Sequence, residues 1–173
     1  MRVGLKILES LRLWLGSKTN SGIWTGSSTT SASSTCWVWP TPSGIWDRTI
    51  AINQTGVFLG LQAVAAIIIR QKSGSIINIS SIVGSRGAIG AFAYVASKLT
   101  VLGMTKSAAQ ESSPYGIRVN AIHPRLIETK IVDESSRKGI NESIRERIPM
   151  GHFADASEVA NLALFLAFGE SSY

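Results

Sequence analysis

The residues best suited to chemistry in this sequence are a tyrosine and a lysine four positions apart, Tyr94 and Lys98. On a helix, residues at i and i+4 are neighbours on one face. A cation beside a phenol favours the phenolate, so the spacing predicts a lowered pKa for Tyr94 and a role as general acid or base. Taken alone, such a pair is more often an exposed helix edge with a solvated charge.

A serine upstream could complete such a site. Ser81 follows an apolar run over 75–80, which has the composition of a buried strand and comes directly after Gly74. A serine at the C-terminal end of a strand that faces the helix of Tyr94 and Lys98 can hold a substrate oxygen while the tyrosine moves its proton. The three residues together predict a site for proton transfer to or from an oxygen.

The hydrophobic spacing predicts the elements that must position these residues. Helices are expected over 49–71 and 92–112, and strands over 75–80 and 117–122. A last helix should begin at Asp155, because Glu158 stands at the capping-box position, and it should end at Gly169. The segments 82–91 and 125–150 read as a glycine-rich loop and a polar lid. Alternating helices and strands predict a parallel sheet covered by helices.

The composition limits the classes of function. The chain has 173 residues with 45% hydrophobic and 16% charged content, which predicts a globular core. The net charge is +6 without a basic block, so we expect no nucleic-acid partner. The only cysteine, Cys36, suits a reducing compartment, and the most apolar run, 57–69, is shorter than a membrane span. We therefore expect a cytoplasmic protein with no membrane partner and no metal.

Residues 44–173 resemble the C-terminal two-thirds of a short-chain dehydrogenase/reductase. The matching blocks, in chain order, are 46–58, 75–81, 94–98, 115–120, 123–129 and 153–160. Any one of these blocks alone would be weak, whereas their order and spacing together are specific. The resemblance implies an α/β fold of three layers (αβα) with an incomplete, Rossmann-like, doubly wound parallel sheet.

The resemblance also implies an enzyme, an NAD(P)-dependent oxidoreductase that interconverts a secondary alcohol and a ketone. In it, Tyr94 would be the general acid or base, and Lys98 would lower the pKa of Tyr94 and bind the nicotinamide ribose. Ser81 would position the substrate oxygen together with Tyr94. Asn53 would hold, through its backbone carbonyl, a water that links Lys98 to solvent.

Cofactor and partner residues are implied in the same way. Ile127 and Thr129 would bind the nicotinamide carboxamide, and the cofactor could be NAD or NADP. The substrate would be a small-molecule alcohol or ketone, such as a 3-oxoacyl thioester, a steroid-like ring or a sugar. The helices of Asn53 and Tyr94 would join copies of the chain into a dimer or tetramer. One departure is Arg125, which stands where the family usually has the glycine that allows close backbone approach to a ligand.

Residues 1–43 do not follow the family pattern. All five tryptophans lie in the first 46 positions, serine and threonine crowd 27–35, and no periodicity persists. We expect a disordered or low-complexity segment here. A sharper hypothesis is a shifted reading frame, because codons can be chosen for 17–33 whose one-base shift encodes the family's G-x-L-D-x-L-x-N-N-x-G pattern.

Two alternatives to an active enzyme follow from the same segment. Residues 1–43 contain no glycine-rich turn of the kind that holds a pyrophosphate at a helix N-terminus. The chain could therefore be an inactive, truncated or frameshifted fragment, or an oligomerisation module. Because the family continues into a final strand beyond position 173, we also expect unpaired sheet edges.

Overall fold

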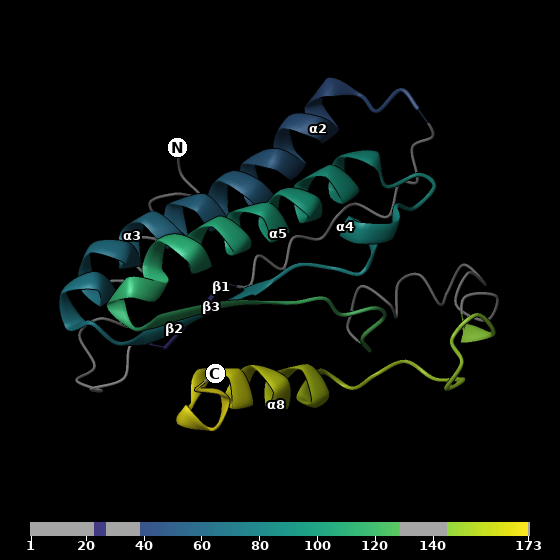
Figure 1. The fold of residues 1–173 in the computed structure, drawn as a ribbon. Helices are drawn as coiled ribbons and strands as arrows, with labels where there is room; N and C mark the ends of the chain where they lie inside the picture. Colours follow the sequence, from purple (N-terminus) through teal and green to yellow (C-terminus); the bar gives the residue numbers. More distant parts are fainter. Residues whose placement is uncertain (1–22, 27–38, 129–144, 173) are drawn as a thin grey trace.

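The structure is a computed structural model that describes residues 23–26, 39–128 and 145–172. Within these residues a parallel sheet lies between two layers of helix (Figure 1). Long helices cover one face of the sheet, and one shorter helix near the C-terminus lies across the other face. The expected three-layer α/β fold is confirmed.

The sheet has three described strands in the order β1 (Ile23–Gly26), β2 (Gly74–Ile79) and β3 (Ile117–Ile122). Both neighbouring pairs are parallel. The predicted strand over 117–122 is confirmed, and the one predicted over 75–80 lies one residue earlier. Strand β1 was not predicted, since four residues are too few to show a period. The rest of 1–38 lies outside the described residues, so the frame-shift hypothesis and the boundary at residue 44 stay predictions.

The helical layer above the sheet is formed by two long rods that lie side by side (Figure 1). One is continuous from α2 (Ser43–Ile50) through a π-helical turn, η1 (Ala51–Thr55), into α3 (Gly56–Gln71). The other is α5 (Phe92–Ser112), which matches the predicted helix at both ends. The first rod begins six residues before the predicted start, because α2 follows Pro42 and carries no buried residue whose spacing could reveal it.

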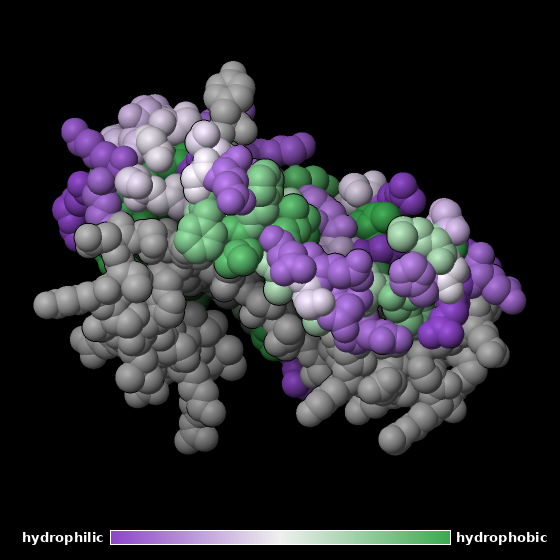
Figure 2. All heavy atoms as spheres, turned by 90° about the horizontal axis from the view of Figure 1, so that it is seen from below, coloured by the Kyte–Doolittle hydropathy of each residue, from purple (hydrophilic) through white to green (hydrophobic). Residues whose placement is uncertain are grey.

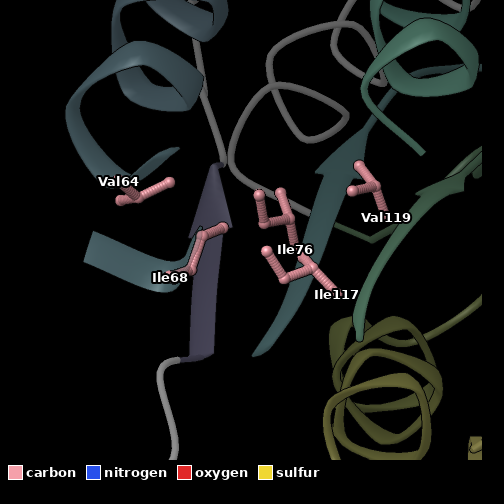
Figure 3. Packing of buried hydrophobic residues seen from close by; sticks show 5 residues of the cluster. All are labelled: Val64, Ile68, Ile76, Ile117 and Val119. Atoms are coloured by element: carbon pink, nitrogen blue, oxygen red, sulfur yellow. The ribbon is translucent and has the colours of Figure 1, made fainter. Parts of the chain in front are cut away.

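The core lies between the first rod and the sheet. Five buried aliphatic side chains form it: Val64, Ile68, Ile76, Ile117 and Val119 (Figure 3). Burying each such side chain stabilises the fold by about 1.5–3 kcal/mol relative to exposure. Since alternate residues of β2 and β3 point to this core, the remaining residues of both strands must face the opposite layer.

The loop after β2 contains a short helix, α4 (Val83–Arg86), where the sequence predicted loop alone. It lies against α5 at Gly84. A Cβ built on Gly84 would stand 2.9 Å from the backbone carbon of Lys98 and 3.0 Å from the nitrogen of Leu99. Such close approach of two backbones requires glycine.

The opposite face of the sheet carries α8 (Ala156–Ala167). The predicted capping box is confirmed: the Asp155 carboxylate accepts a hydrogen bond from the Ser157 N–H at 2.7 Å, and Glu158 accepts one from the Asp155 N–H at 2.8 Å. The helix ends at Ala167, two residues before the predicted glycine, and a 3₁₀ turn, η3 (Gly169–Ser171), follows.

Among the described helices, the run Ser43–Gln71 is long and apolar enough to cross a membrane by length and composition. It has 29 residues because α2 joins α3 without a break, and it is therefore longer than the 57–69 segment that the sequence singled out.

Seen from the side of α8, the surface shows apolar side chains next to polar ones (Figure 2).

Candidate active site

Tyr94 and Lys98 lie in the first two turns of α5, next to the carboxyl end of β2. The Lys98 side chain is buried, and its Nζ donates a hydrogen bond to the Ile79 carbonyl at 3.0 Å. The same Nζ lies 5.6 Å from the centroid of the Tyr94 ring. The structure therefore places the phenol and the ammonium on one face of the helix, at the sheet edge where parallel strands bind ligands.

Ser81 comes directly beyond this end of β2 and is buried. Its hydroxyl lies close enough to the Tyr94 phenol to lower the pKa of that group. The Val83 N–H donates a long hydrogen bond to the same hydroxyl at 3.4 Å. Two side chains thirteen positions apart in sequence thus meet at one point, as the sequence predicted for Ser81 and the helix of Tyr94.

The protonation of the site differs from the prediction. Burial raises the pKa of Tyr94, and the nearby Ser81 hydroxyl offsets only part of that rise. Burial also lowers the pKa of Lys98. The predicted lowering of the Tyr94 pKa is wrong for this structure, because the desolvation of the phenol outweighs the nearby charge, and the ammonium is bound to the Ile79 carbonyl. Tyr94 therefore holds its proton at neutral pH.

Asn53 lies in the π-helical turn and is buried against α5. Its Nδ2 donates to the Ser97 hydroxyl at 3.2 Å, and that hydroxyl donates to the Tyr94 carbonyl at 2.7 Å. Ser97 is fully buried. Its hydroxyl thus joins Asn53 to the backbone of Tyr94 across two helices, whereas the predicted role of the Asn53 carbonyl stays a prediction.

Ser97 was missed by the sequence reasoning, although it lies between Tyr94 and Lys98. A signal was present, because residues at i and i+3 share a helix face. Two further buried hydrogen bonds that sequence reasoning missed fasten α5 to β2: Ser80 Oγ to the Lys98 carbonyl at 2.8 Å, and Asn78 Nδ2 to Thr105 Oγ1 at 2.9 Å. These bonds fix the height of α5, including the turn of Tyr94 and Lys98, above the sheet.

The loop after β3 carries the other predicted residues. Ile127 forms a parallel bridge with Ala154, whereas Thr129 lies outside the described residues, as does most of the predicted lid. Arg125 is exposed, and its Nη2 donates to the Arg147 carbonyl at 2.9 Å. The guanidinium is thus bound to a neighbouring backbone segment.

His123 contacts the site from the end of β3. Its Nδ1 lies 3.3 Å from the Ser81 carbonyl, so it donates there when it carries the proton. The Ile82 N–H donates to the Pro124 carbonyl at 3.1 Å. Both contacts hold the loop of Ser81 against β3. Within the described residues no group of three His, Cys, Asp or Glu could hold a metal ion.

Known proteins resemble this arrangement in sequence and in fold. Residues 32–173 match the family model described as enoyl-(acyl carrier protein) reductase. The chain is 46% identical over 128 residues, 74% of its length, to the 3-oxoacyl-[acyl-carrier-protein] reductase FabG of Thermotoga maritima, of which it covers 52%. It is 45% identical, again over 74% of its length, to a 3-alpha-(or 20-beta)-hydroxysteroid dehydrogenase of Mycobacterium bovis, of which it covers 47%.

A solved structure of NAD+-bound xylitol dehydrogenase superposes with a TM-score of 0.80 at 26% identity, covering 98% of this chain and 69% of that one. The chain spans about half the length of the two relatives named above. The family match begins twelve residues before the boundary predicted at 44. On the strength of this match and these identities, the chain belongs to the short-chain dehydrogenase/reductase family.

Proposed function

We propose that this chain carries the proton-transfer site of an NAD(P)-dependent oxidoreductase that interconverts a secondary alcohol and a ketone. The observation that carries the proposal is the position of the Tyr94 ring, whose centroid lies 5.6 Å from the buried Lys98 Nζ, with the buried Ser81 hydroxyl next to the phenol. These groups lie at the carboxyl end of a parallel strand, which is where ligands bind in open α/β sheets.

In the reducing direction, Ser81 holds the carbonyl oxygen of the ketone by its hydroxyl. Tyr94 donates its phenolic proton to that oxygen, and the product alcohol forms when a hydride reaches the carbonyl carbon. A dihydronicotinamide, when bound, would supply this hydride. The buried Lys98 ammonium stabilises the phenolate that remains, because two opposite charges interact more strongly away from water. Asn53 and Ser97 hold the turn that carries Tyr94.

The raised pKa of Tyr94 supports reduction as the direction favoured at neutral pH. A protonated phenol can donate at once, whereas oxidation of an alcohol requires the phenolate. We therefore expect the rate of alcohol oxidation to rise with pH above neutrality, as the fraction of phenolate grows. The reduction rate should fall only when the pH approaches the raised pKa of Tyr94, because the phenol stays protonated below it.

The residues present fit the nicotinamide end of the cofactor. Lys98 would bind the ribose, and Ile127 would bind the carboxamide. Thr129, which the resemblance also assigns to the carboxamide, lies outside the described residues. The xylitol dehydrogenase structure holds NAD+, which supports a dinucleotide in this chain, and both NAD and NADP stay open. The Arg125 side chain is directed to the Arg147 carbonyl, to which its Nη2 donates.

The substrate class is drawn from the relatives. Their names describe a 3-oxoacyl thioester reductase and a hydroxysteroid dehydrogenase, so we propose a ketone or secondary alcohol on an acyl chain or a fused ring. Contact between copies of the chain is supported by exposed apolar side chains on the two rods, among them Phe58, Leu59 and Leu99.

The test of the proposal is the substitution Tyr94→Phe, which removes the phenolic proton. Turnover of a 3-oxoacyl thioester or steroid ketone with NADH or NADPH should fall at least about 100-fold, while cofactor affinity changes little. Tyr115→Phe is the matched control, because Tyr115 is exposed on a turn beyond α5. Near-normal turnover of Tyr94→Phe would remove Tyr94 from the mechanism.

Lys98→Ala should lower both turnover and cofactor affinity, since the ammonium is proposed to act on both. Lys106→Ala is its control, because Lys106 lies on the same helix and is exposed. A loss confined to turnover would show that Lys98 does not contact the cofactor.

The competing proposal is that these 173 residues keep the Ser-Tyr-Lys site but bind dinucleotide weakly. It is favoured by the absence of a glycine-rich turn in the sequence 1–43. Three or four hydrogen bonds of about 0.5–1.5 kcal/mol each at the nicotinamide end correspond to roughly millimolar affinity. Calorimetry decides: a dissociation constant below about 10 μM would exclude this alternative.

A further inference from the structure

Helix α8 is tied to the sheet at its C-terminal end by one side chain of β3. Arg118 Nη1 donates to the Leu166 carbonyl at 2.8 Å and to Ser171 Oγ at 2.9 Å, and its Nη2 donates to the Phe168 carbonyl at 3.1 Å. A guanidinium is well suited to the last carbonyls of a helix, where the backbone dipoles leave negative charge. Strand β2 adds a bond from Ser75 Oγ to the Leu166 carbonyl at 2.7 Å.

The N-terminal end of α8 is tied to the loop that contains Ile127. The Ala154 N–H donates to the Leu126 carbonyl at 3.1 Å, and the Glu128 N–H donates to the Ala154 carbonyl at 2.9 Å. Ala154 directly precedes Asp155, the residue that caps α8. The backbone of 126–128 is therefore bonded to the residue next to the helix cap.

Between these two ends, α8 is held weakly by its own side chains. None of the described residues of α8 is buried, and Leu164 and Phe165 are 57% and 45% exposed. The helix is about 18 Å long and stiffened at its start by the capping box. A stiff rod with little side-chain burial takes its position from the polar contacts at its ends.

We propose that Arg118 is a positioning residue for the loop 126–128, acting through α8. Its guanidinium fixes the helix on the sheet, and the helix fixes the backbone of Ile127 through Ala154. The link from this loop to the nicotinamide rests on the proposed function, whereas the coupling between Arg118 and the loop does not.

Hydrogen exchange of the full chain tests the coupling. In Arg118→Gln, the N–H groups of Ala154 and Glu128 should exchange at least about tenfold faster, because the charge-assisted bonds that hold the far end of the helix are lost. The Ser80 N–H, which is bonded to the Ile122 carbonyl at 2.8 Å, should keep its rate. Equal acceleration at all three groups, or none at Ala154 and Glu128, would overturn the proposal.

Milder variants keep the test decisive if Arg118→Gln fails to fold. Ser75→Ala removes one bond to the Leu166 carbonyl and should accelerate the same two N–H groups by a smaller factor. Arg118→Lys keeps the cation but loses the planar guanidinium group. Its exchange rates at Ala154 and Glu128 should therefore lie between those of Arg118→Gln and the parent. Arg70→Gln, at the exposed end of α3, is the control and should change the exchange rate of neither N–H group. Rates equal to those of the parent in both Arg118→Lys and Ser75→Ala would overturn the proposal.

A titration with NADH separates this inference from the proposed function. If the parent chain binds NADH and the coupling holds, Arg118→Gln should raise the dissociation constant at least about tenfold, whereas Arg70→Gln should leave it unchanged. If the parent does not bind, the proposed function fails, and the exchange rates at Ala154 and Glu128 still decide whether Arg118 positions the loop. Unchanged affinity together with accelerated exchange would confine the role of Arg118 to the loop and overturn its link to the cofactor.

Discussion

The two faces of the sheet are covered in different ways. On one face, α3 buries Val57, Val64 and Ile68, and α5 buries Val101 among other residues. On the other face, no described residue of α8 is buried, and hydrogen bonds at its two ends hold the helix. The position of α5 is thus fixed by packing along its length, whereas that of α8 depends on a few polar contacts.

The proposed proton-transfer site lies on the densely packed face, and the burial of its groups has opposing effects. Asn53, Ser97 and Lys98 are all buried there, and the low dielectric strengthens the hydrogen bonds between such groups. The same burial raises the pKa of Tyr94. The arrangement that holds the tyrosine in place therefore also makes its phenolate harder to form.

The largest effect on stability is expected where α4 meets α5. Gly84→Ala would bring a methyl group within 3 Å of backbone atoms of Lys98, and backbone cannot move aside as a flexible side chain can. We expect a loss of about 3 kcal/mol in the free energy of unfolding, measured by urea denaturation. Gly103→Ala is the control: its Cβ would meet nothing within 4 Å, and alanine favours the helix, so stability should rise slightly. Equal behaviour of the two variants would contradict the close packing of α4 on α5.

A smaller effect distinguishes the two faces directly. Val64→Ala removes a buried side chain of α3 from the core and should cost about 2 kcal/mol in the free energy of unfolding. Leu164→Ala removes a larger side chain from α8, yet it should cost less than about 0.5 kcal/mol, because that side chain is 57% exposed. Thermal or urea denaturation of both variants measures the two losses in the free energy of unfolding. A cost for Leu164→Ala as large as that for Val64→Ala would show that α8 is also held by packing.

The smallest effect is expected at the start of α8 and depends on pH. Hydrogen bonds from Ser157 hold the pKa of Asp155 below its ordinary value of 3.8. A carboxylate with a lowered pKa stabilises the fold above its ordinary value, and the contribution is lost as the pH falls through the lowered value. Asp155→Ala should therefore lower the melting temperature slightly at pH 7 and less at about pH 2–3. An equal fall of the melting temperature at both pH values would contradict the role of the Asp155 charge.

The elements with a strong local signal could be predicted from the sequence. Strand β3 alternates buried and partly buried residues at its start, and Pro114 and Gly116 mark the end of α5 before it. The capping box at Asp155 is another local pattern. In contrast, β1 has only four residues, and its pairing with β2 is a contact across the fold that no local pattern encodes.

The candidate site was predicted only in part, because some of its contacts follow from local spacing and others form only across the fold. The spacing of Tyr94 and Lys98 indicated that they share a helix face, and the strand pattern brought Ser81 beside them. The bond between Asn53 and Ser97 joins residues 44 positions apart, so only the packing of two helices creates it. The direction of the Tyr94 pKa shift depends on burial, which the spacing of two side chains does not contain.

The parallel order of the strands has a consequence for the way the chain folds. Each pair of neighbouring strands joins residues more than forty positions apart, such as Ile23 with Ser75 and Gly74 with Ile117. Contacts that close long loops lose much chain entropy before they gain any stability, so folding with a high contact order is slow. During synthesis, β1 emerges well before its partner β2, and the apolar residues of α3 are made before the strands that cover them. A newly made chain should therefore keep apolar surface exposed for longer than a helical protein of equal length.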